Sequence, residues 1–304
     1  MKSTISIILF ATATIVFAFT SGKKPSAKNA KKVLDGFCQY VPSGKAVVGG
    51  DTVSVQSFYM STTEITNFQY LEFLYHLKRN KELDKLKLAQ IDSTKWLNSM
   101  GYGEAYVKHY HNHSAYHSFP VVNVSKKGAE MYCEWLTEVY DSISGGELKL
   151  QFRIPTRAEY MRAARGDNHS KVYTWEGIRI TKSDGKPVFH GQIQANCLSN
   201  GAECIRRNPE TGKLEFIMAD YRDEYFYADN ADVTAPAKSY WPNDFGFYNI
   251  NGNVEEMISD SDHAVGGGWK SPGYDIRNES IQPFKEASST VGFRVIATYI
   301  EPIK

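Results

Sequence analysis

The feature that most constrains this chain is the loss of helical periodicity after residue 165. From there to the end, glycine, asparagine, aspartate and aromatic residues dominate, and no apolar stripe repeats every three or four positions. This composition predicts short strands joined by long loops. Because loops leave backbone groups without a regular partner, something other than ladder hydrogen bonds must hold this half of the chain together.

The first half of the chain carries clearer helical signals. From Thr66 onward, apolar residues recur at helical spacing, and the charged run KRNKELDKLK that follows is predicted to be solvated surface. Ser125 is a predicted N-cap for a second helix, which ends before a Gly-Gly turn. Thr156 and Glu159 form a capping box that begins a third helix. Together with the strand-like segment FCQYVPSGKAVVGG, these signals predict an α+β fold.

The N-terminus has the pattern of a secretory signal. Lys2 supplies a positive charge, residues 5–19 form an apolar run too short for an ordinary transmembrane helix, and residues 16–18 offer a cleavage point. We predict a signal peptide over residues 1–18, a flexible leader over 19–36 and one folded domain over 37–300. An uncleaved membrane anchor is the alternative. No cysteine lies near the junction, so no lipid anchor is predicted, and the protein is expected to be exported.

Charge and cysteine usage narrow the partners further. The 35 basic and 34 acidic residues give a net charge of +1, which disfavours nucleic acid as a partner. In an oxidising compartment the four cysteines are able to pair, and Cys197 and Cys204 form the easiest local bridge. Cys38 and Cys133 are what remains, and their pairing stays open.

Eight segments, taken in order, resemble the successive blocks of the formylglycine-generating enzyme (sulfatase-modifying factor) family. The resemblance implies a C-type-lectin-like variant fold with low regular secondary-structure content. Within the family, HSAYHSFPVVNVS, SYWPNDFGFYNINGNVEE and the GGxWK loop look most like the domain of gliding-motility and type IX secretion lipoproteins, which implies a bacterial periplasm or cell surface. The eight segments are FYMSTTEITNFQYLEFL, FPVVNVSKKGAEMYCEWL, FRIPTRAEYMRAARG, YTWEG, QANC, APAKSYWPNDFGFYNINGNVEEM, GGGWK and VGFRV.

The loop GGGWKSPGYDI departs from the family where its chemistry resides. The family's oxidase needs two thiolates here, because soft sulfur ligands hold copper(I). Aligned on the glycines, those positions are Ser271 and Ile276. A protonated hydroxyl and a hydrocarbon cannot form a copper(I) pair, so no copper is expected and we interpret the domain as non-catalytic. A metal-dependent oxidase or another enzyme of the superfamily is the alternative.

The stretch HYHNHSAYH is the second candidate for metal chemistry. His109, His111 and His113 lie on one side of any extended segment, a spacing that suits zinc or iron. A surface segment with solvated imidazoles is the competing interpretation, and the two stay open here.

Structural calcium is implied by the resemblance. Asn249, the Gly252 and Val254 carbonyls and Glu256 would ligate one ion. Asn196, the Cys197 carbonyl, Asp229 and the Ala231 carbonyl would ligate a second. Asparagine-, aspartate- and glycine-rich loops suit a hard cation, because calcium accepts amide, carboxylate and carbonyl oxygens in irregular geometry. Arg294 in VGFRV is predicted to be a buried structural arginine paired with an acid.

The retained loop is the predicted recognition surface. Its glycines keep the shape while its thiols are absent, so Trp269, Lys270 and Tyr274 are the residues predicted to bind a partner. The expected function is a non-catalytic, calcium-stabilised binding or assembly module of the bacterial envelope, linked to gliding motility or type IX secretion. Its expected partner is an envelope protein or a glycan.

Overall fold

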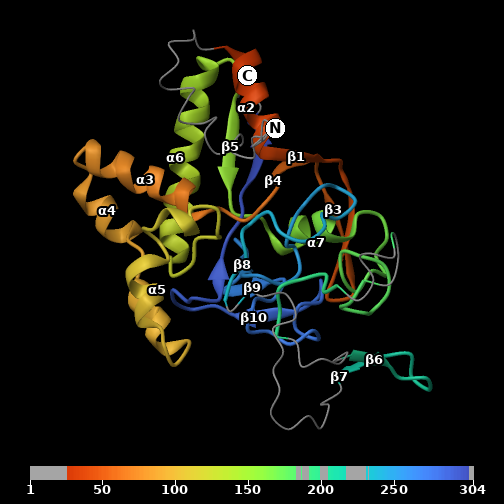
Figure 1. Ribbon diagram of the computed structural model, residues 1–304. Coiled ribbons are helices and arrows are strands. Elements are labelled where there is room, and N and C mark those ends of the chain that lie inside the picture. The colour runs from red at the N-terminus through yellow and green to blue at the C-terminus, as the bar shows by residue number, and fades with distance from the viewer. Residues whose placement is uncertain are drawn as a thin grey trace, which may run out of the picture.

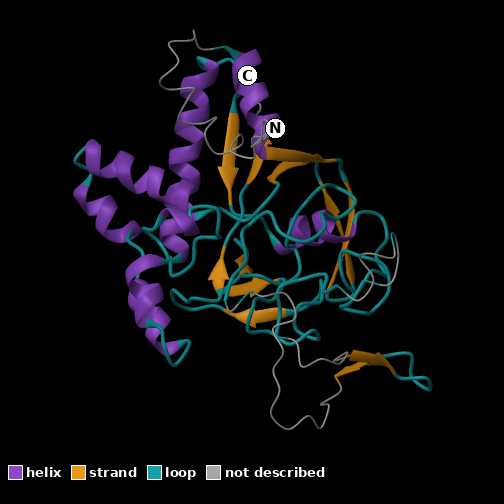
Figure 2. Cartoon of the chain, in the orientation of Figure 1, coloured by secondary structure: helices purple, strands orange, loops and turns teal. Residues whose placement is uncertain are grey.

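The computed structural model describes residues 26–182, 186, 192–198, 205–216, 231 and 233–300. The predicted signal peptide lies outside these residues. Within the described part of the chain no helix follows residue 165, and the central loops between the sheets dominate the view in Figure 2. The helices (Figure 1) are α2 (Ala27–Phe37), α3 (Asn67–Arg79), α4 (Leu83–Ala89), α5 (Glu104–His109), α6 (Lys126–Ser144) and α7 (Arg157–Arg165), with short 3-10 helices η1 (Ser93–Asn98) and η2 (Ser114–Tyr116).

The strands form two four-stranded sheets and two hairpins. The first sheet has the antiparallel order β1-β4-β12-β5, and the second has the order β10-β9-β8-β11, in which β11 runs parallel to β8. β2-β3 and β6-β7 are the hairpins. The strands are β1 (Cys38–Val41), β2 (Gly44–Val48), β3 (Asp51–Val55), β4 (Phe58–Ser61), β5 (Leu150–Arg153), β6 (Ile205–Arg207), β7 (Leu214–Phe216), β8 (Glu255–Met257), β9 (His263–Val265), β10 (Ile281–Pro283), β11 (Val291–Gly292) and β12 (Ile296–Tyr299).

The predicted helix starts are confirmed. The Ser125 hydroxyl accepts a hydrogen bond from the Gly128 N–H at 3.0 Å and so caps α6, which ends at a left-handed Gly145. The capping box of Thr156 and Glu159 begins α7. These local signals set where the helices begin, and their apolar faces decide what they cover.

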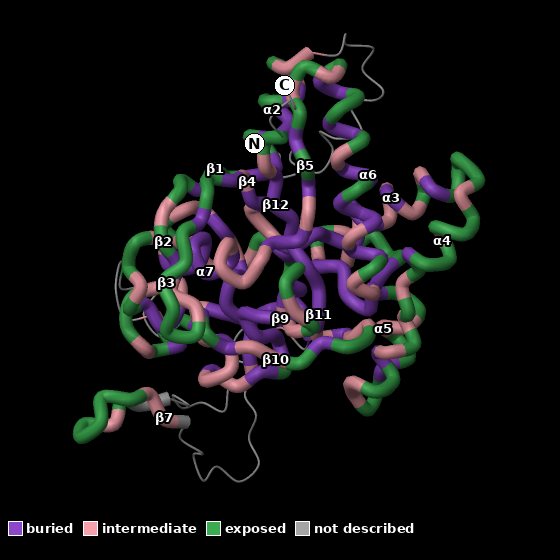
Figure 3. The backbone as a smooth tube through the Cα atoms, turned by 180° about the vertical axis from the view of Figure 1, so that it is seen from behind, coloured by how far each residue is buried: buried purple, intermediate pink, exposed green. Residues whose placement is uncertain are grey.

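The core lies on both sides of the first sheet. On one side α2, α3 and α6 pack against it, and on the other side α7 packs with β9 and the loop around residue 250. Figure 3 shows buried backbone concentrated around β9, β11 and β12, with exposed backbone along α4 and the β2-β3 hairpin. The long loops are therefore enclosed between the two sheets, where their polar groups need partners.

The predicted flexible leader is wrong from residue 27 onward. Residues 27–37 form α2, which packs along α6. Ala30 and Leu34 are fully buried in the same cluster as α6. The sequence pattern was misleading because lysines dominate the exposed face of this helix, while its apolar face is covered by a helix a hundred residues away. No helix among the described residues has the length and apolar character to cross a membrane.

Replacing Leu34 by alanine tests this correction. The side chain is fully buried, so we expect the free energy of unfolding to fall by about 2–3 kcal/mol, the lower part of the range for buried leucines, because α2 covers only one side of its cluster. Urea denaturation measures the change. The exposed neighbour Lys31 is the control, and its replacement by alanine is expected to leave stability within about 0.5 kcal/mol. If Leu34→Ala and Lys31→Ala both change the free energy of unfolding by the same small amount, the original prediction of a flexible leader would be correct.

Candidate functional site

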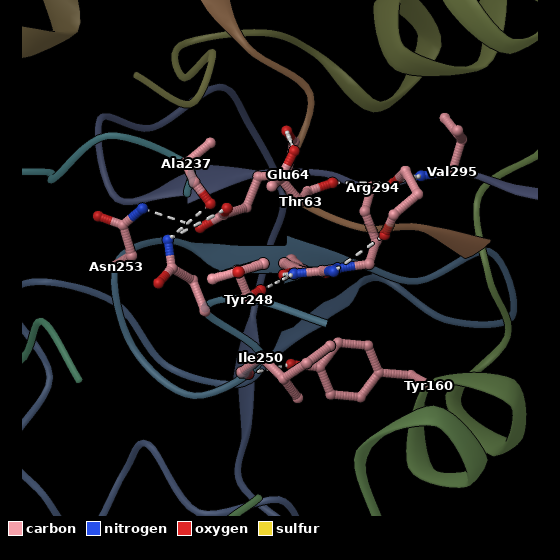
Figure 4. A network of polar contacts seen from close by, with 12 residues as sticks. Thr63, Glu64, Tyr160, Ala237, Tyr248, Ile250, Asn253, Arg294 and Val295 are labelled. Atoms are coloured by element: carbon pink, nitrogen blue, oxygen red, sulfur yellow. Dashed lines mark hydrogen bonds and ion pairs between the residues drawn. The ribbon is translucent and has the colours of Figure 1, made fainter. Parts of the chain in front are cut away.

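A fully buried ion pair lies at the centre of the molecule. Arg294, which follows β11, binds both carboxylate oxygens of Glu256 in β8, through Nε at 2.5 Å and Nη2 at 2.6 Å. The guanidinium also donates to the Ser61 and Tyr248 carbonyls, at 3.2 and 3.0 Å (Figure 4). Burial raises the pKa of the Glu256 carboxyl and the arginine opposes that rise. The predicted buried arginine with an acidic partner is confirmed.

A second acid, Glu64, is buried beside this pair. Its carboxylate accepts hydrogen bonds from the Asn253 and Asn249 side-chain amides, at 2.8 and 3.4 Å. Burial raises the pKa of Glu64 to about 8, partly offset by the attraction of Arg294. Two buried carboxyl groups thus face one guanidinium, so the centre has an excess of acid over base.

Asn249 leaves one buried polar atom without a partner. Its side-chain amide nitrogen donates to the Ala237 carbonyl at 3.1 Å, while its Oδ1 has no hydrogen-bond partner. The residue is also in the left-handed region, with φ of 52°. An orphaned buried oxygen is a costly feature that calls for a bound cation or water. This oxygen is the one that the predicted calcium site requires.

Gly252 and Asn196, two of the other predicted calcium ligands, lie next to each other. Gly252, with φ of 83°, packs so closely on the Asn196 carbonyl that a side chain would collide with it. Asn196 donates from its side-chain amide to the Val233 carbonyl at 2.8 Å and to Asn253 Oδ1 at 3.1 Å. Val254, Cys197 and Glu256 are buried and Ala231 is half-buried. Asp229, the fourth ligand of the second predicted site, lies outside the described residues.

The loop at residues 266–276 keeps its glycine-dependent shape. Gly267 has φ of 65°, and a side chain there would collide with Ile276 and the Asp275 carbonyl. Ile276 is fully buried in an apolar cluster with Val172 and Tyr173. One of the two positions at which the resemblance implies a thiolate in the oxidase is therefore filled here by a packing residue.

The other thiol position, Ser271, has a structural contact of its own. Its hydroxyl accepts from the Gly268 N–H at 3.0 Å, and its own N–H donates to the Gly268 carbonyl at 2.8 Å, which closes the turn. Burial and then repulsion from Asp275 raise the pKa of the neighbouring Glu255 to about 7. Burial also raises the pKa of Asp275. Acidic neighbours disfavour a thiolate, which needs positive surroundings.

The structure contradicts one residue of the predicted recognition surface, and the binding role of the other two stays a prediction. Trp269 is 5% exposed, stacks on Trp96 with ring centroids 6.1 Å apart, and donates to the Ser289 carbonyl at 3.1 Å. It is a core residue, so its assignment to a binding surface is wrong. Lys270 is exposed and donates to the Ser99 carbonyl, and Tyr274 is half-buried beneath Arg277, whose guanidinium lies 3.6 Å from the ring centroid.

The three histidines do not share one side of an extended segment, so that expectation is wrong. His109 ends α5, His111 is buried, and His113 is exposed and caps η2. In the part of the chain that the structure describes, no group of three or more His, Cys, Asp or Glu side chains gathers in a metal-binding arrangement. His111 is instead a core residue, and burial lowers its pKa to about 3.

The structure describes three of the four cysteines, Cys38, Cys133 and Cys197. Cys38 and Cys133 are buried free thiols in one apolar cluster, and burial raises the pKa of both. Cys204 lies outside the described residues, so its predicted bridge to Cys197 stays a prediction.

Two central residues were missed by sequence reasoning. Glu64 stands in the block TTEITN, two residues before the predicted helix that begins at Thr66, and Asn253 stands inside the predicted calcium loop. Nothing near Glu64 in the sequence signals burial, because its partners lie 185 and 189 residues away. For Asn253 the only local signal was the asparagine-rich composition of the loop.

Comparison with known proteins agrees with this architecture. The sequence matches the family described as "Sulfatase-modifying factor enzyme 1-like domain" over residues 22–299. The formylglycine-generating enzyme of Streptomyces coelicolor is 29% identical over 164 residues, which are 54% of this chain and 37% of that protein. The formylglycine-generating enzyme of Mus musculus is 24% identical over 233 residues, which are 68% of this chain and 50% of that protein. The chain spans half or less of the length of these two relatives.

The fold also has a solved counterpart. The crystal structure of CarF superposes with a TM-score of 0.51 at 18% identity, over 87% of this chain and 98% of that chain. At this identity the likeness shows a shared α+β fold and nothing finer.

Proposed function

Because this chain belongs to the sulfatase-modifying factor enzyme 1-like domain family, we propose that it is a non-catalytic binding or assembly module of the bacterial envelope, stabilised by calcium. One observation carries the proposal: Ile276 fills a thiol position as a fully buried packing residue, while Gly267 keeps the loop closed around it. A chain under selection for the oxidase would need a ligand atom there. The proposed setting is gliding motility or type IX secretion, and it rests on the sequence likeness to those lipoproteins.

The lack of oxidase chemistry is directly testable. The relatives are formylglycine-generating enzymes, so the purified protein is incubated with copper(I) and a cysteine-containing peptide, and aldehyde formation is followed by mass spectrometry. No aldehyde is expected. Conversion of the peptide cysteine would overturn the non-catalytic assignment and support the alternative of a metal-dependent oxidase.

The binding role is tested on the corrected surface. Chemical crosslinking in envelope fractions, followed by quantitative mass spectrometry, is compared between the wild type and a Lys270→Glu, Tyr274→Ala variant. A specific envelope partner is expected to be lost from the variant. The control is Lys149→Glu, another exposed lysine, which pairs with Asp141 beside the end of α6. Identical partner profiles for all three proteins would count against recognition by this loop.

Calcium fits the buried centre in two respects. The Asn249 Oδ1 atom is buried without a partner, and two carboxyl groups there face a single guanidinium. A hard cation would satisfy both features. Asn249, the Gly252 and Val254 carbonyls and Glu256 would hold it, with both Glu256 oxygens already held by Arg294. Such an ion would tie the loop to β8 and would carry out no reaction.

We expect calcium, at a hundredfold excess over its Kd, to raise the melting temperature of the wild type by about 5 °C. The reason is that an ion that binds only the native state stabilises that state by about 2.7 kcal/mol at this concentration. Asn249→Gly is expected to abolish the shift. Asn123→Gly is the matched control, because this buried asparagine is also left-handed, with φ of 61°, and lies outside the proposed ligand loop. It should keep the shift. A wild type that does not respond to calcium would refute the site.

A further inference from the structure

A cavity whose described lining includes no residue of the retained loop opens on one side of the molecule. Its volume is about 400 Å³, within the range of sites that enclose small ligands. One wall is aromatic and comes from α5, η2 and the residues just after them. The other wall comes from residue 231 and from residues 233–240. The lining residues are Tyr106, Tyr116, Phe119, Ala231, Val233, Thr234, Ala235, Pro236, Ser239 and Tyr240.

The two walls are fixed to each other before any ligand arrives. The Ala237 N–H donates to the Ser118 carbonyl at 2.8 Å, and the hydroxyls of Tyr110 and Thr234 lie 2.7 Å apart. The Ala235 N–H donates to Asn253 Oδ1 at 2.7 Å, which ties the same wall to the buried polar centre. A preformed cavity loses little conformational freedom when it binds.

The aromatic wall is equally well supported. The rings of Tyr116 and Phe119 lie 5.1 Å apart, and Tyr116 packs on the buried Tyr110 at 5.2 Å. The Asn67 side-chain amide donates to the Tyr110 and Tyr116 carbonyls, at 3.1 and 3.0 Å, and so holds the backbone of this segment. The rings therefore present a rigid surface to the cavity.

Tyr240 is held in the cavity at a conformational cost. Its φ is 61°, in the left-handed region that a bulky side chain rarely adopts. Such strain costs of order 1–3 kcal/mol and concentrates at functional positions. Among the described non-glycine residues with positive φ, the others are asparagines and one lysine, so Tyr240 is the only aromatic residue in this conformation. This conformation is an observation independent of the cavity itself.

The lining chemistry selects the ligand class. None of the lining residues that the structure describes carries a formal charge. Lys238, in the same segment, lies over the Tyr248 ring instead. A charged ligand would lose its hydration without gaining a counter-charge, and a purely apolar ligand would strip water from the hydroxyl and backbone groups that border the rings. A ring with apolar C–H faces and hydroxyl edges satisfies both surfaces.

We propose that this cavity binds a neutral sugar ring, as the free sugar or as the end of an oligosaccharide. The aromatic faces pack on the C–H face of the ring, and the hydroxyls of residues such as Tyr116 and Ser239 bond to its edge. The inference rests on the proposed binding function and names a ligand and a second site for it. It uses neither Lys270 nor Tyr274.

Saturation-transfer NMR on the full chain tests the inference with neutral hexoses, N-acetylhexosamines and their disaccharides as probes. At least one sugar is expected to show transfer, and its affinity is expected to fall at least tenfold in Tyr240→Gly, which removes the ring and also relieves the left-handed strain. The control is Lys81→Gly, which relieves the same strain at φ of 60° on the surface and should bind as the wild type does. Thermal melting of each variant verifies that it is folded.

Two outcomes would overturn the inference. The first is the absence of saturation transfer to every sugar tested, even if a proline-rich peptide binds in the cavity. The second is equal sugar affinity in the wild type and Tyr240→Gly. Either outcome would leave the result of the envelope-partner experiment on Lys270 unchanged. In the same way, failure to find an envelope partner would not change the sugar binding measured at Tyr240.

Discussion

The free energy of unfolding is expected to fall by about 3–5 kcal/mol when Arg294 is replaced by methionine. The variant removes the guanidinium that binds both oxygens of Glu256, and it leaves Glu256 and Glu64 buried with no cation from the protein. A buried carboxyl without a partner must either stay charged at high cost or take up a proton. Urea denaturation at pH 7, followed by tryptophan fluorescence, measures the loss.

The matched control is Arg153→Met. Arg153 also binds both oxygens of one carboxylate, that of Glu159, at 2.8 and 2.5 Å, but its side chain is 34% exposed against 0% for Arg294. Water replaces the lost partner there, so we expect a change of about 1 kcal/mol or less. The double variant Arg294→Met, Glu256→Met is expected to recover part of the loss. Equal losses for the two single variants would contradict the role assigned to burial.

Acid is expected to destabilise the protein through His111. Its Nδ1 lies 3.0 Å from Asn67 Oδ1, and because the Asn67 amide nitrogen already donates to two carbonyls, that oxygen must accept and Nδ1 must carry the proton. Nε2 then faces the Asn123 amide at 3.5 Å as an acceptor. The site therefore holds a neutral imidazole, in agreement with the lowering of its pKa by burial.

The direction of the pH effect follows from that lowered pKa. In the unfolded chain the imidazole takes up a proton near pH 6.5, but in the folded protein it does so only near pH 3. Below pH 6.5 the unfolded state binds more protons, so stability is lost as the pH falls. At about 1.4 kcal/mol per unit, the wild type should lose about 3 kcal/mol between pH 6.5 and pH 4 from this group.

Urea denaturation over that pH range isolates the contribution. His111→Asn is expected to flatten the profile by that amount, because it keeps an amide donor near the Nδ1 position and has nothing to titrate. His113→Asn is the control, since this ring is exposed, and its profile should follow that of the wild type. A His111→Asn profile as steep as the wild-type profile would show that other groups cause the acid loss.

The starts of α3, α6 and α7 were predictable because their causes are local. The caps at Ser125 and Thr156 close hydrogen bonds within three residues, and the glycines around Gly267 impose a backbone shape wherever they stand. Arg294 in the block VGFRV was also predicted to be a buried arginine. Its partner was not, because Glu256 lies 38 residues away and reaches it only through the pairing of β8 with β11.

The errors concern burial, which depends on distant parts of the chain. Trp269 looked like a surface residue because its loop is polar, but it is covered by Trp96, far earlier in the sequence. Residues 27–36 looked like a leader because they are rich in lysine, but α6 supplies the surface that their apolar face needs. His111 was a possible metal ligand because of its spacing from His109 and His113. In the structure, Asn67 and Asn123 lie within hydrogen-bonding distance of its two ring nitrogens instead.

The sequence by itself determined the starts of α3, α6 and α7, the loop-rich second half and the resemblance to the family, and it predicted the loss of the thiol pair at Ser271 and Ile276. Those features follow from residue type and short spacing. Only the tertiary structure decided which polar groups share the centre, which aromatic residues are core, and that Tyr240 lines a cavity at a strained φ. The physical reason is that capping and turn energies are settled between near neighbours, whereas desolvation is settled by whichever distant segment covers a side chain.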